Sequence, residues 1–274
     1  LIENGKEILF ANLGTDHVTI VEELARRESH GEPAPRVISV PHENVAVHMA
    51  GGYAMQTGRG QAVLVHVDAG TANAAMAMHN LRRSRLPVLV MAGRAPFALR
   101  GELPAGRDTY VHYVQDPFDM AGIVRPYTKW EYCLPSGAVA KSMLMRALAV
   151  MQSDPCGPVY LTLPREILAE TFEGTARRDP PALQDSAVAA RGVEPEMARR
   201  IATMLMAADS PMNVTAYLGR NHEAPAILGA LAEEAGIRVV ETIPHWMNLP
   251  QDHPCHCGFD AGPFLQKTDV GMLL

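Results

Sequence analysis

Residues 37–54 read VISVPHENVAVHMAGGYA, and this stretch decides the fold. It opens with an apolar, β-rich run over 37–40 and continues from residue 44 as a helix of small and apolar residues. A strand that leads directly into a helix is the unit from which parallel sheets are built. Between the two lies Glu43, a carboxylate that the helix dipole favours and lost hydration disfavours. If the carboxylate of Glu43 meets a ligand nitrogen, we expect this residue to be functional.

The same alternation recurs along the chain. Helix-period segments alternate with β-rich apolar runs typical of buried strands. The expected strands cover residues 7–10, 37–40, 62–67, 88–92 and 159–163, and the expected helices cover 18–27, 44–57, 72–84 and 138–152. This order predicts the α/β class, with a doubly wound parallel sheet covered by helices on both faces.

A stretch rich in Pro, Asp, Arg and Ala interrupts the alternation and lacks either periodicity, which is typical of a linker. We therefore expect a first domain over 1–170, a linker over 171–195 and a partial second α/β domain over 196–274. The second domain is small for a doubly wound sheet, which usually needs about 100 residues or more. Both ends of the chain look cut, and residues 269–274 resemble a strand just beginning. The expected elements of this domain are helices over 196–207 and 224–235 and strands over 213–218 and 238–241.

Composition narrows the class of protein. The chain has 274 residues, a net charge of -6 and a pI near 6.0, so it offers no basic surface for nucleic acid. Four cysteines in a chain of this length do not suggest a secreted disulfide framework, which favours the cytoplasm. No apolar run reaches the roughly 20 residues of a membrane-spanning helix, so we expect no membrane partner. We therefore expect a protein that acts on small molecules.

Several familiar motifs are absent. The sequence has no phosphate-binding P-loop, no Gly-x-Gly-x-x-Gly fingerprint after a strand and no Gly-x-Ser-x-Gly elbow. Cys255 and Cys257 lie near His253, but this spacing is unlike that of structural zinc sites. We therefore assign no metal ligand in this chain.

Polar and small residues follow three of the expected strands, in segments 10–16, 42–43 and 66–70. The carboxyl ends of parallel strands share one edge of the sheet, where α/β proteins bind ligands. His66 lies there and is suited to proton exchange near neutral pH, although a core histidine bonded to backbone is the competing interpretation. Residues 70–73 are expected to start the next helix with a small-residue turn, where backbone amides could approach a ligand, and a simple tight turn fits equally well.

The motif around Glu43, His42-Glu43-x5-Met49-Ala50-x-Gly52-Tyr53-Ala54-x2-Thr57-Gly58, resembles the segment that supplies the activating glutamate of thiamine diphosphate enzymes. That family includes acetolactate synthase, benzoylformate decarboxylase and benzaldehyde lyase. The likeness covers nearly the whole chain, as the pyrimidine-binding domain and the start of the central domain. It extends through Arg125-Pro126-x2-Lys129-Trp130, Gly157-Pro158-Val159-Tyr160-Leu161 and His253-Pro254-Cys255.

The resemblance implies an enzyme, a lyase or carboligase that uses thiamine diphosphate. Glu43 would hydrogen-bond N1′ of the aminopyrimidine and so promote formation of the C2-ylide of the thiazolium. The ylide would attack a 2-oxo acid, carbon dioxide would leave, and the remaining carbanion would be protonated or ligated to a second carbonyl. By the same resemblance, Asn12, Gly14 and Asn73 contact the pyrimidine.

The resemblance also implies substrate residues. His66 would serve as an acid or hydrogen-bond donor, and Thr15 stands where benzoylformate decarboxylase has a serine for the substrate carboxylate. Apart from the resemblance, Gln115 is expected to reach the site from the long connection between Arg94 and Pro117, because a long loop beside a sheet edge is often functional. Leu13 replaces a proline usual in the decarboxylase branch. Asp68 replaces a small residue and would face an anionic substrate, pair with Arg94 or cap the helix.

His66-x2-Ala69-Gly70-Thr71-x-Asn73 is more similar to the decarboxylase branch than to acetolactate synthase, which has a Ser-Gly-Pro-Gly element at this place. A 2-oxo acid decarboxylase or carboligase is therefore the leading hypothesis. The alternatives are an acetolactate synthase-like transferase and a non-catalytic pyrimidine-domain subunit or remnant.

In this family a third domain binds the diphosphate and Mg²⁺ through a Gly-Asp-Gly to Asn motif, which this sequence lacks. The resemblance therefore implies that the chain alone is inactive and that the full-length protein is a homodimer or homotetramer. Whether the central domain binds FAD is left open, because no residue pattern supports or excludes it.

Overall fold

The computed structural model describes residues 1–171, 187–188 and 192–274. The chain divides into two compact units, Leu1–Ala190 and Arg191–Leu274, which are described separately here. Most of the predicted linker over 171–195 lies outside the described residues, so the proposed domain boundaries stay a prediction. Among the described residues, no helix is both long and apolar enough to cross a membrane.

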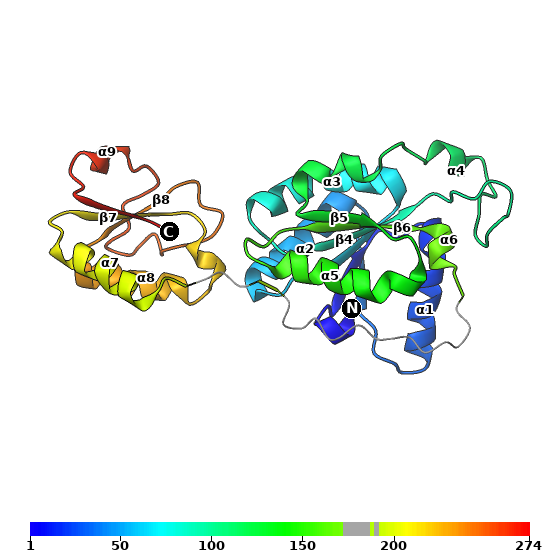
Figure 1. Ribbon diagram of the computed structural model, residues 1–274, viewed down its shortest axis with the longest axis horizontal. Coiled ribbons are helices and arrows are strands. Elements are labelled where there is room, and N and C mark those ends of the chain that lie inside the picture. Colours follow the sequence, from blue (N-terminus) through cyan, green and yellow to red (C-terminus); the bar gives the residue numbers. More distant parts are fainter. Residues whose placement is uncertain (172–186, 189–191) are drawn as a thin grey trace. The chain divides into compact units, whose positions relative to one another are not determined.

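The first unit contains a parallel sheet of six strands in the order β2-β1-β3-β4-β6-β5 (Figure 1). Every neighbouring pair of strands in it is parallel. The α/β class with a doubly wound parallel sheet is thus confirmed. The strands are β1 (Ile8–Ala11), β2 (Arg36–Ser39), β3 (Ala62–Val65), β4 (Leu89–Arg94), β5 (Trp130–Cys133) and β6 (Val159–Pro164).

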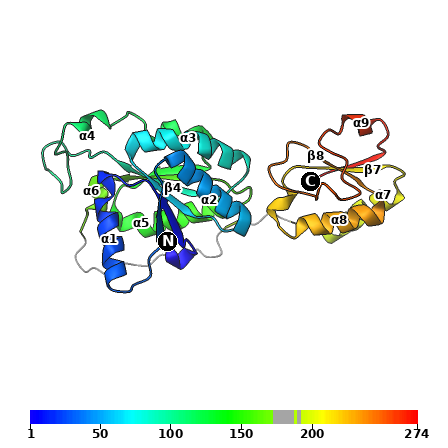
Figure 2. The ribbon, with the colours of Figure 1, turned by 180° about the vertical axis from the view of Figure 1, so that it is seen from behind.

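Helices cover both faces of this sheet, with α3 and α5 on opposite sides (Figures 1 and 2). The apolar core on the α5 side joins that helix to the strands through Ala147, Leu148 and Met151, and α1 packs there through Ile20 and Leu24. The long helices are α1 (Val18–Ser29), α2 (Glu43–Thr57), α3 (Val67–Arg83) and α5 (Ala140–Gln152), and the short ones are α4 (Val111–Val114) and α6 (Arg165–Leu168).

Small residues let α2 approach its neighbours closely. Ala46, Ala50 and Ala54 are buried along one side of this helix, and a Cβ on Gly51 would lie 2.9 Å from Leu81 Cδ1 of α3. The helix ends at Gly58, whose φ of 69° is the left-handed conformation that glycine adopts without strain. The small residues therefore let α2 pack closely against α3.

Two features of the first unit differ from the sequence-based expectation. The half-buried edge strand β5 was not predicted, because its residues 130–133 do not form a continuous apolar run. The predicted start of the helix at residues 70–73 is wrong, because α3 begins directly after His66 and these residues already lie inside it. Val67 makes this abrupt change of direction with φ at 39°, an unusual backbone conformation for a β-branched residue.

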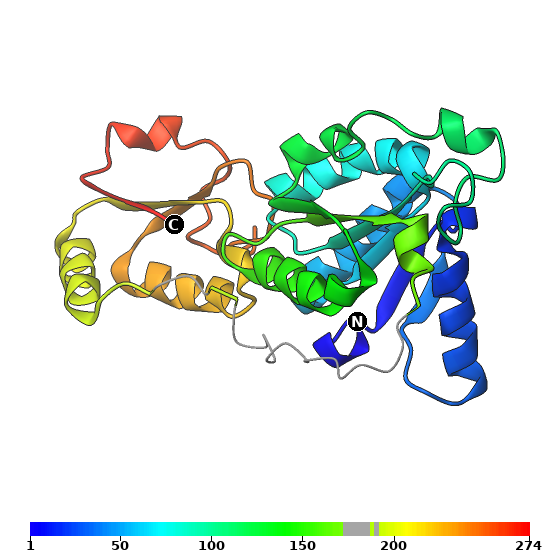
Figure 3. The same cartoon turned by 45° about the vertical axis from the view of Figure 1, so that its right-hand side comes forward.

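The second unit has a parallel sheet in the order β8-β7-β9, with α7 and α8 packed on one side of it (Figure 3). Its core is formed by Leu205 of α7, Leu228 of α8 and neighbouring apolar residues. The elements are α7 (Pro195–Ala207), β7 (Pro211–Thr215), α8 (Ala224–Ala235), β8 (Arg238–Glu241), the short α9 (Gly262–Leu265) and β9 (Val270–Leu273). The strand predicted over 213–218 begins and ends earlier, because Leu218–Arg220 is a 3-10 turn.

Candidate active site

The candidate site lies where three neighbouring strands of the first unit end. The order β2-β1-β3 means that the chain leaves β1 toward one side and later returns on the other, so β1 and β3 flank a topological switch point. Asn12 follows β1, Glu43 begins the helix after β2, and His66 follows β3. The predicted convergence of these three segments is thus present in the fold.

Glu43 is the first residue of α2 and is buried, with 6% of its surface exposed. Its Oε1 accepts a hydrogen bond from Asn12 Nδ2 at 2.9 Å, and its Oε2 accepts one from Asn73 Nδ2 at 3.0 Å. The helix amino terminus adds favourable dipoles to these two amide donors. Three of the predicted cofactor residues therefore form one hydrogen-bonded group.

Gly70 leaves the space that this group requires. A Cβ at this position would lie 3.1 Å from Glu43 Oε1 and 3.3 Å from Val65 Cβ. Those separations are tighter than ordinary van der Waals contact, so a larger residue would crowd the carboxylate. The small residues that the sequence places here thus bring α3 close to Glu43.

His66 caps the amino end of α3, and its side chain is 30% exposed. Its Nδ1 lies 2.5 Å from Asp16 Oδ1. The hydrogen bond to Asp16 raises the pKa of His66 above its usual value; burial opposes this rise, and the charges of Asp16, Glu43 and Asp68 add to it. The competing interpretation of His66 as a core histidine bonded to backbone does not describe this geometry, because its Nδ1 contacts a carboxylate.

Gly14 and Thr15 lie beside this histidine in the connection after β1. The ring of His66 occupies the place where a Cβ of Gly14 would be, so only glycine allows this contact. Gly14 N donates to His17 Nδ1 at 3.1 Å. Thr15 is exposed and begins the 3-10 turn η2 (Thr15–His17). Its hydroxyl is thus open to a ligand at the same strand end.

Gln115 belongs to a different part of the first unit, directly after the short helix α4. Within the described residues, no hydrogen bond joins it to Glu43 or His66, and its backbone N–H donates to Val111 O. The structure therefore does not bring Gln115 together with the other predicted site residues.

Two predicted roles of Asp68 are wrong. Arg94 pairs with Asp116 through Nη2 at 3.3 Å, and His66, not Asp68, is the N-cap of α3. Asp68 Oδ1 is buried and accepts no hydrogen bond from the described residues. A carboxylate oxygen without a donor therefore lies in the first turn of the helix that begins at His66.

Sequence reasoning missed Asp16, which is buried with 4% exposure and contacts His66 directly. A signal was present, because an acid and a histidine, Asp16-His17, follow a buried strand within a Gly-Thr-Asp-His segment. The pattern alone could not show which way the carboxylate of Asp16 points.

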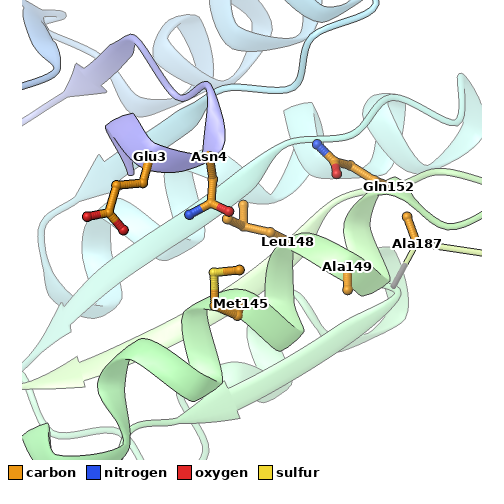
Figure 4. Close-up of a pocket in the computed structure, with 7 residues that line it drawn as sticks. All are labelled: Glu3, Asn4, Met145, Leu148, Ala149, Gln152 and Ala187. Atoms are coloured by element: carbon orange, nitrogen blue, oxygen red, sulfur yellow. The ribbon is translucent and has the colours of Figure 1, made fainter. Parts of the chain in front are cut away.

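Two cavities of the first unit lie away from this site. One of about 220 Å³ is lined by the amino-terminal turn, α5 and Ala187 (Figure 4). A second of about 670 Å³ is mostly apolar and lies between α1, the sheet and α5. Neither is lined by a predicted site residue. The candidate site is thus defined by its hydrogen bonds and strand ends.

The residues present fit an aminopyrimidine ring. A carboxylate offers about four lone-pair positions, and the two amides occupy two of those of Glu43, which leaves acceptors for a ring nitrogen. Among the described residues, no three His, Cys, Asp or Glu side chains are grouped to hold a metal ion. The Cys255 to Cys257 segment instead runs beside β8, since Cys257 N donates to Val239 O at 2.7 Å.

Comparisons with known proteins agree on one family. The profile described as "Thiamine pyrophosphate enzyme, N-terminal TPP binding domain" matches residues 1–123. The acetolactate synthase isozyme 1 large subunit of Escherichia coli K12 is 28% identical over 247 residues, which are 87% of this chain and 41% of that protein.

Two solved structures share the fold. A proposed thiamin diphosphate-dependent enzyme from Mycobacterium smegmatis superposes with a TM-score of 0.66 at 27% identity, over 94% of this chain and 46% of that one. The thiamine diphosphate-dependent 4-hydroxybenzoylformate decarboxylase of Rhodococcus jostii RHA1 gives 0.72 at 21% identity, over 94% and 46%. The chain spans less than half the length of these relatives. Residues 1–123 of this chain thus match the N-terminal TPP-binding domain of thiamine pyrophosphate enzymes, and Glu43 with its two asparagines lies within this matched part.

Proposed function

We propose that this chain is the cofactor-activating part of a thiamine diphosphate-dependent decarboxylase or carboligase for 2-oxo acids. The observation that carries the proposal is the buried carboxylate of Glu43, which receives one amide hydrogen bond on each oxygen at the switch point of the sheet. A charge in this position is costly unless its free lone pairs meet a donor. The protonated N1′ of an aminopyrimidine is such a donor.

Each residue of the group has a distinct task. Glu43 holds and returns the proton at N1′, while Asn12 and Asn73 fix the plane of the carboxylate so that this exchange needs no reorientation. Gly14, which lies against the ring of His66, would contact the same pyrimidine through its backbone. When bound, the cofactor supplies the carbon nucleophile and the electron sink that decarboxylation of a 2-oxo acid requires.

His66 faces the substrate in this proposal. Its raised pKa keeps it protonated nearer to neutral pH than an ordinary histidine, which suits a proton donor. Thr15, exposed in the same connection, would bind the substrate carboxylate. Gln115 would join the site only if the segment after α4 moved, so we give it the smallest part.

The choice between protonation and ligation rests on His66. A proton donor beside the carbanion favours the decarboxylase outcome, and a structural relative is a decarboxylase of 4-hydroxybenzoylformate. An acetolactate synthase-like transferase is the second candidate, favoured by the likeness to the Escherichia coli large subunit. A non-catalytic subunit is the third.

The proposal also covers the domains of the protein and its assembly. Residues 1–170 would form the pyrimidine-binding domain, with 171–195 as linker and 196–274 as part of the central domain. A separate domain would bind the diphosphate and Mg²⁺, so this chain alone would be inactive. We further propose a cytoplasmic homodimer or homotetramer, without nucleic acid or membrane partners.

A product assay tests the proposal. The protein that carries this chain is supplied with thiamine diphosphate and Mg²⁺, and pyruvate and benzoylformate are offered separately. Carbon dioxide with benzaldehyde from benzoylformate supports the decarboxylase, whereas acetolactate from pyruvate supports the transferase. Absence of any turnover of 2-oxo acids, in protein that binds the cofactor, contradicts both enzyme proposals and favours the non-catalytic subunit.

A further inference from the structure

Asp16 is an acid that the proposed mechanism does not use, although it lies in the middle of the site. It is the second residue of η2, and its carboxylate packs against the backbone of Gly93 at the end of β4. A Cβ at position 93 would overlap the carboxylate. Asp16 is therefore enclosed on the side of β4 and directed toward the end of β3.

Three nitrogen atoms surround this carboxylate. His66 Nδ1 lies 2.5 Å from Oδ1, and Val67 N donates to Oδ2 at 3.4 Å. His17 Nε2 is 3.1 Å from Oδ2, at an angle that does not make a hydrogen bond. The arrangement suits an ionised carboxylate, which accepts and cannot donate.

The charge state of Asp16 follows from its neighbours. Burial raises the pKa of the Asp16 carboxyl group, but the close contacts with His17 and His66 together outweigh it and place this pKa below its usual range. Asp16 is thus ionised at neutral pH. Because it only accepts, the proton in the short contact belongs to Nδ1 of His66.

With Nδ1 committed to Asp16, the free nitrogen of His66 is Nε2. We propose that Asp16 is the positioning residue of the candidate active site, which fixes the Nδ1–H form of His66 and so presents Nε2 as the atom that gives or takes a proton. When Nε2 loses its proton, His66 becomes neutral and keeps its other proton on Nδ1. The inference rests on the proposed function for the part that Nε2 plays toward a 2-oxo acid.

Other charged groups face His66 as well. Glu43 of α2 and Asp68 of α3 act on it through space, and His17 lies edge-on to it with ring centroids 6.3 Å apart. Of the three acids, Asp16 is the one whose carboxylate touches the imidazole. Asp68 therefore offers a matched control, since its removal takes away charge and leaves the hydrogen bond.

The test is a titration of His66 by NMR, with ¹³C- and ¹⁵N-labelled histidine in the whole chain. A His66→Gln variant assigns the signals, and circular dichroism checks that each variant folds. We expect the neutral ring of the unmodified protein to carry its proton on Nδ1. In Asp16→Asn the pKa of His66 should fall by about 1 to 2 units and the proton should move toward Nε2. Asp68→Asn should lower the pKa less and keep the Nδ1–H form.

Two results overturn the inference. One is an NMR spectrum of the unmodified protein in which neutral His66 carries its proton on Nε2. This measurement does not depend on the folding of any variant. The other is a folded Asp16→Asn protein in which neither the pKa nor the tautomer of His66 changes. Neither readout depends on turnover, so the proposed function can fail separately. If the NMR shift is present but the pH dependence of kcat in the cofactor-loaded protein is unchanged by Asp16→Asn, the Asp16 inference holds and the catalytic part of His66 is wrong.

Discussion

Asn73 on α3 donates its side-chain amide to Glu43 on α2 at 3.0 Å, so a single hydrogen bond joins the two helices at the carboxylate. The contact joins the first residue of α2 to the second turn of α3. Because Glu43 is buried, its oxygen atoms need such donors in place of water. Asn73 thus orients the carboxylate and contributes to the stability of the unit.

Removing this donor has a measurable cost. Asn73→Ala leaves Oε2 of a buried carboxylate without its partner, and we expect the free energy of unfolding to fall by about 1 to 2 kcal/mol. Urea denaturation of the chain measures the change. Asn80→Ala is the control, since Asn80 lies on the same helix and its hydrogen bond to His48 is exposed. Equal losses in the two variants would contradict a special part for Asn73.

Glu43→Gln tests the activation step. The amide keeps the size of the side chain but cannot take up a proton, so turnover of a 2-oxo acid by the cofactor-loaded protein should fall by about 100-fold or more. Carbon dioxide release measures it. Glu7→Gln, an exposed acid before β1, should leave the rate unchanged. Full activity in Glu43→Gln would end the proposed mechanism.

Gly93→Ala probes the enclosure of Asp16. The new methyl group would overlap the carboxylate, and we expect a loss of about 1 to 3 kcal/mol in the free energy of unfolding together with a lower pKa of His66. Gly52→Ala on α2 is the control, because a Cβ there meets no atom within 4 Å. That change should leave the protein as stable or stabilise it by about 0.5 to 1 kcal/mol. If Gly93→Ala changes neither the free energy of unfolding nor the pKa of His66, Asp16 is free to move.

The Asp16 and His66 pair should make stability depend on pH. The pKa of Asp16 is below its usual value of 3.8 in the folded protein, so its contribution is present above pH 3.8 and is lost as the pH falls through the folded-state pKa. The pKa of His66 is above 6.5, so its contribution is present below pH 6.5 and is lost as the pH rises through the folded-state pKa. The pair therefore stabilises most between about pH 4 and 6.5.

Unfolding measured from pH 4 to 9 checks this window. The difference in stability between the unmodified protein and His66→Gln should be largest below pH 6.5 and should shrink at higher pH. His30→Gln, an exposed histidine after α1, should give a difference that is small at every pH. A constant difference for His66 across the range would contradict the pairing.

The sequence predicted those parts of the fold that depend on periodicity. Long apolar runs such as the one over 62–67 identified the central strands, and the His42-Glu43 motif identified the residue at the centre of the site. Strand β5 escaped, because its residues 130–133 are half-buried and include the charged Glu131, so they form no continuous apolar run. Local patterns also misplaced the start of α3, since nothing in them shows that Val67 adopts a positive φ.

Side-chain pairings were beyond the reach of sequence patterns. Asn12 and Asn73 were chosen through a family resemblance, and only the fold shows that they bind the two oxygens of one carboxylate. Asp16 was missed for the same reason, because its partner His66 is 50 positions away along the chain. Such contacts depend on strand order, which is a property of the whole sheet.

Val67 destabilises the folded protein through its backbone conformation. A β-branched side chain at a φ of 39° stores strain of about 1 to 3 kcal/mol, and this strain lies in the single residue between His66 and the remainder of α3. A sequence optimised only for durability would have glycine or asparagine there. Selection for heat resistance would therefore favour substitution of Val67. Such a change would relax the backbone next to His66 and let the orientation of its side chain vary.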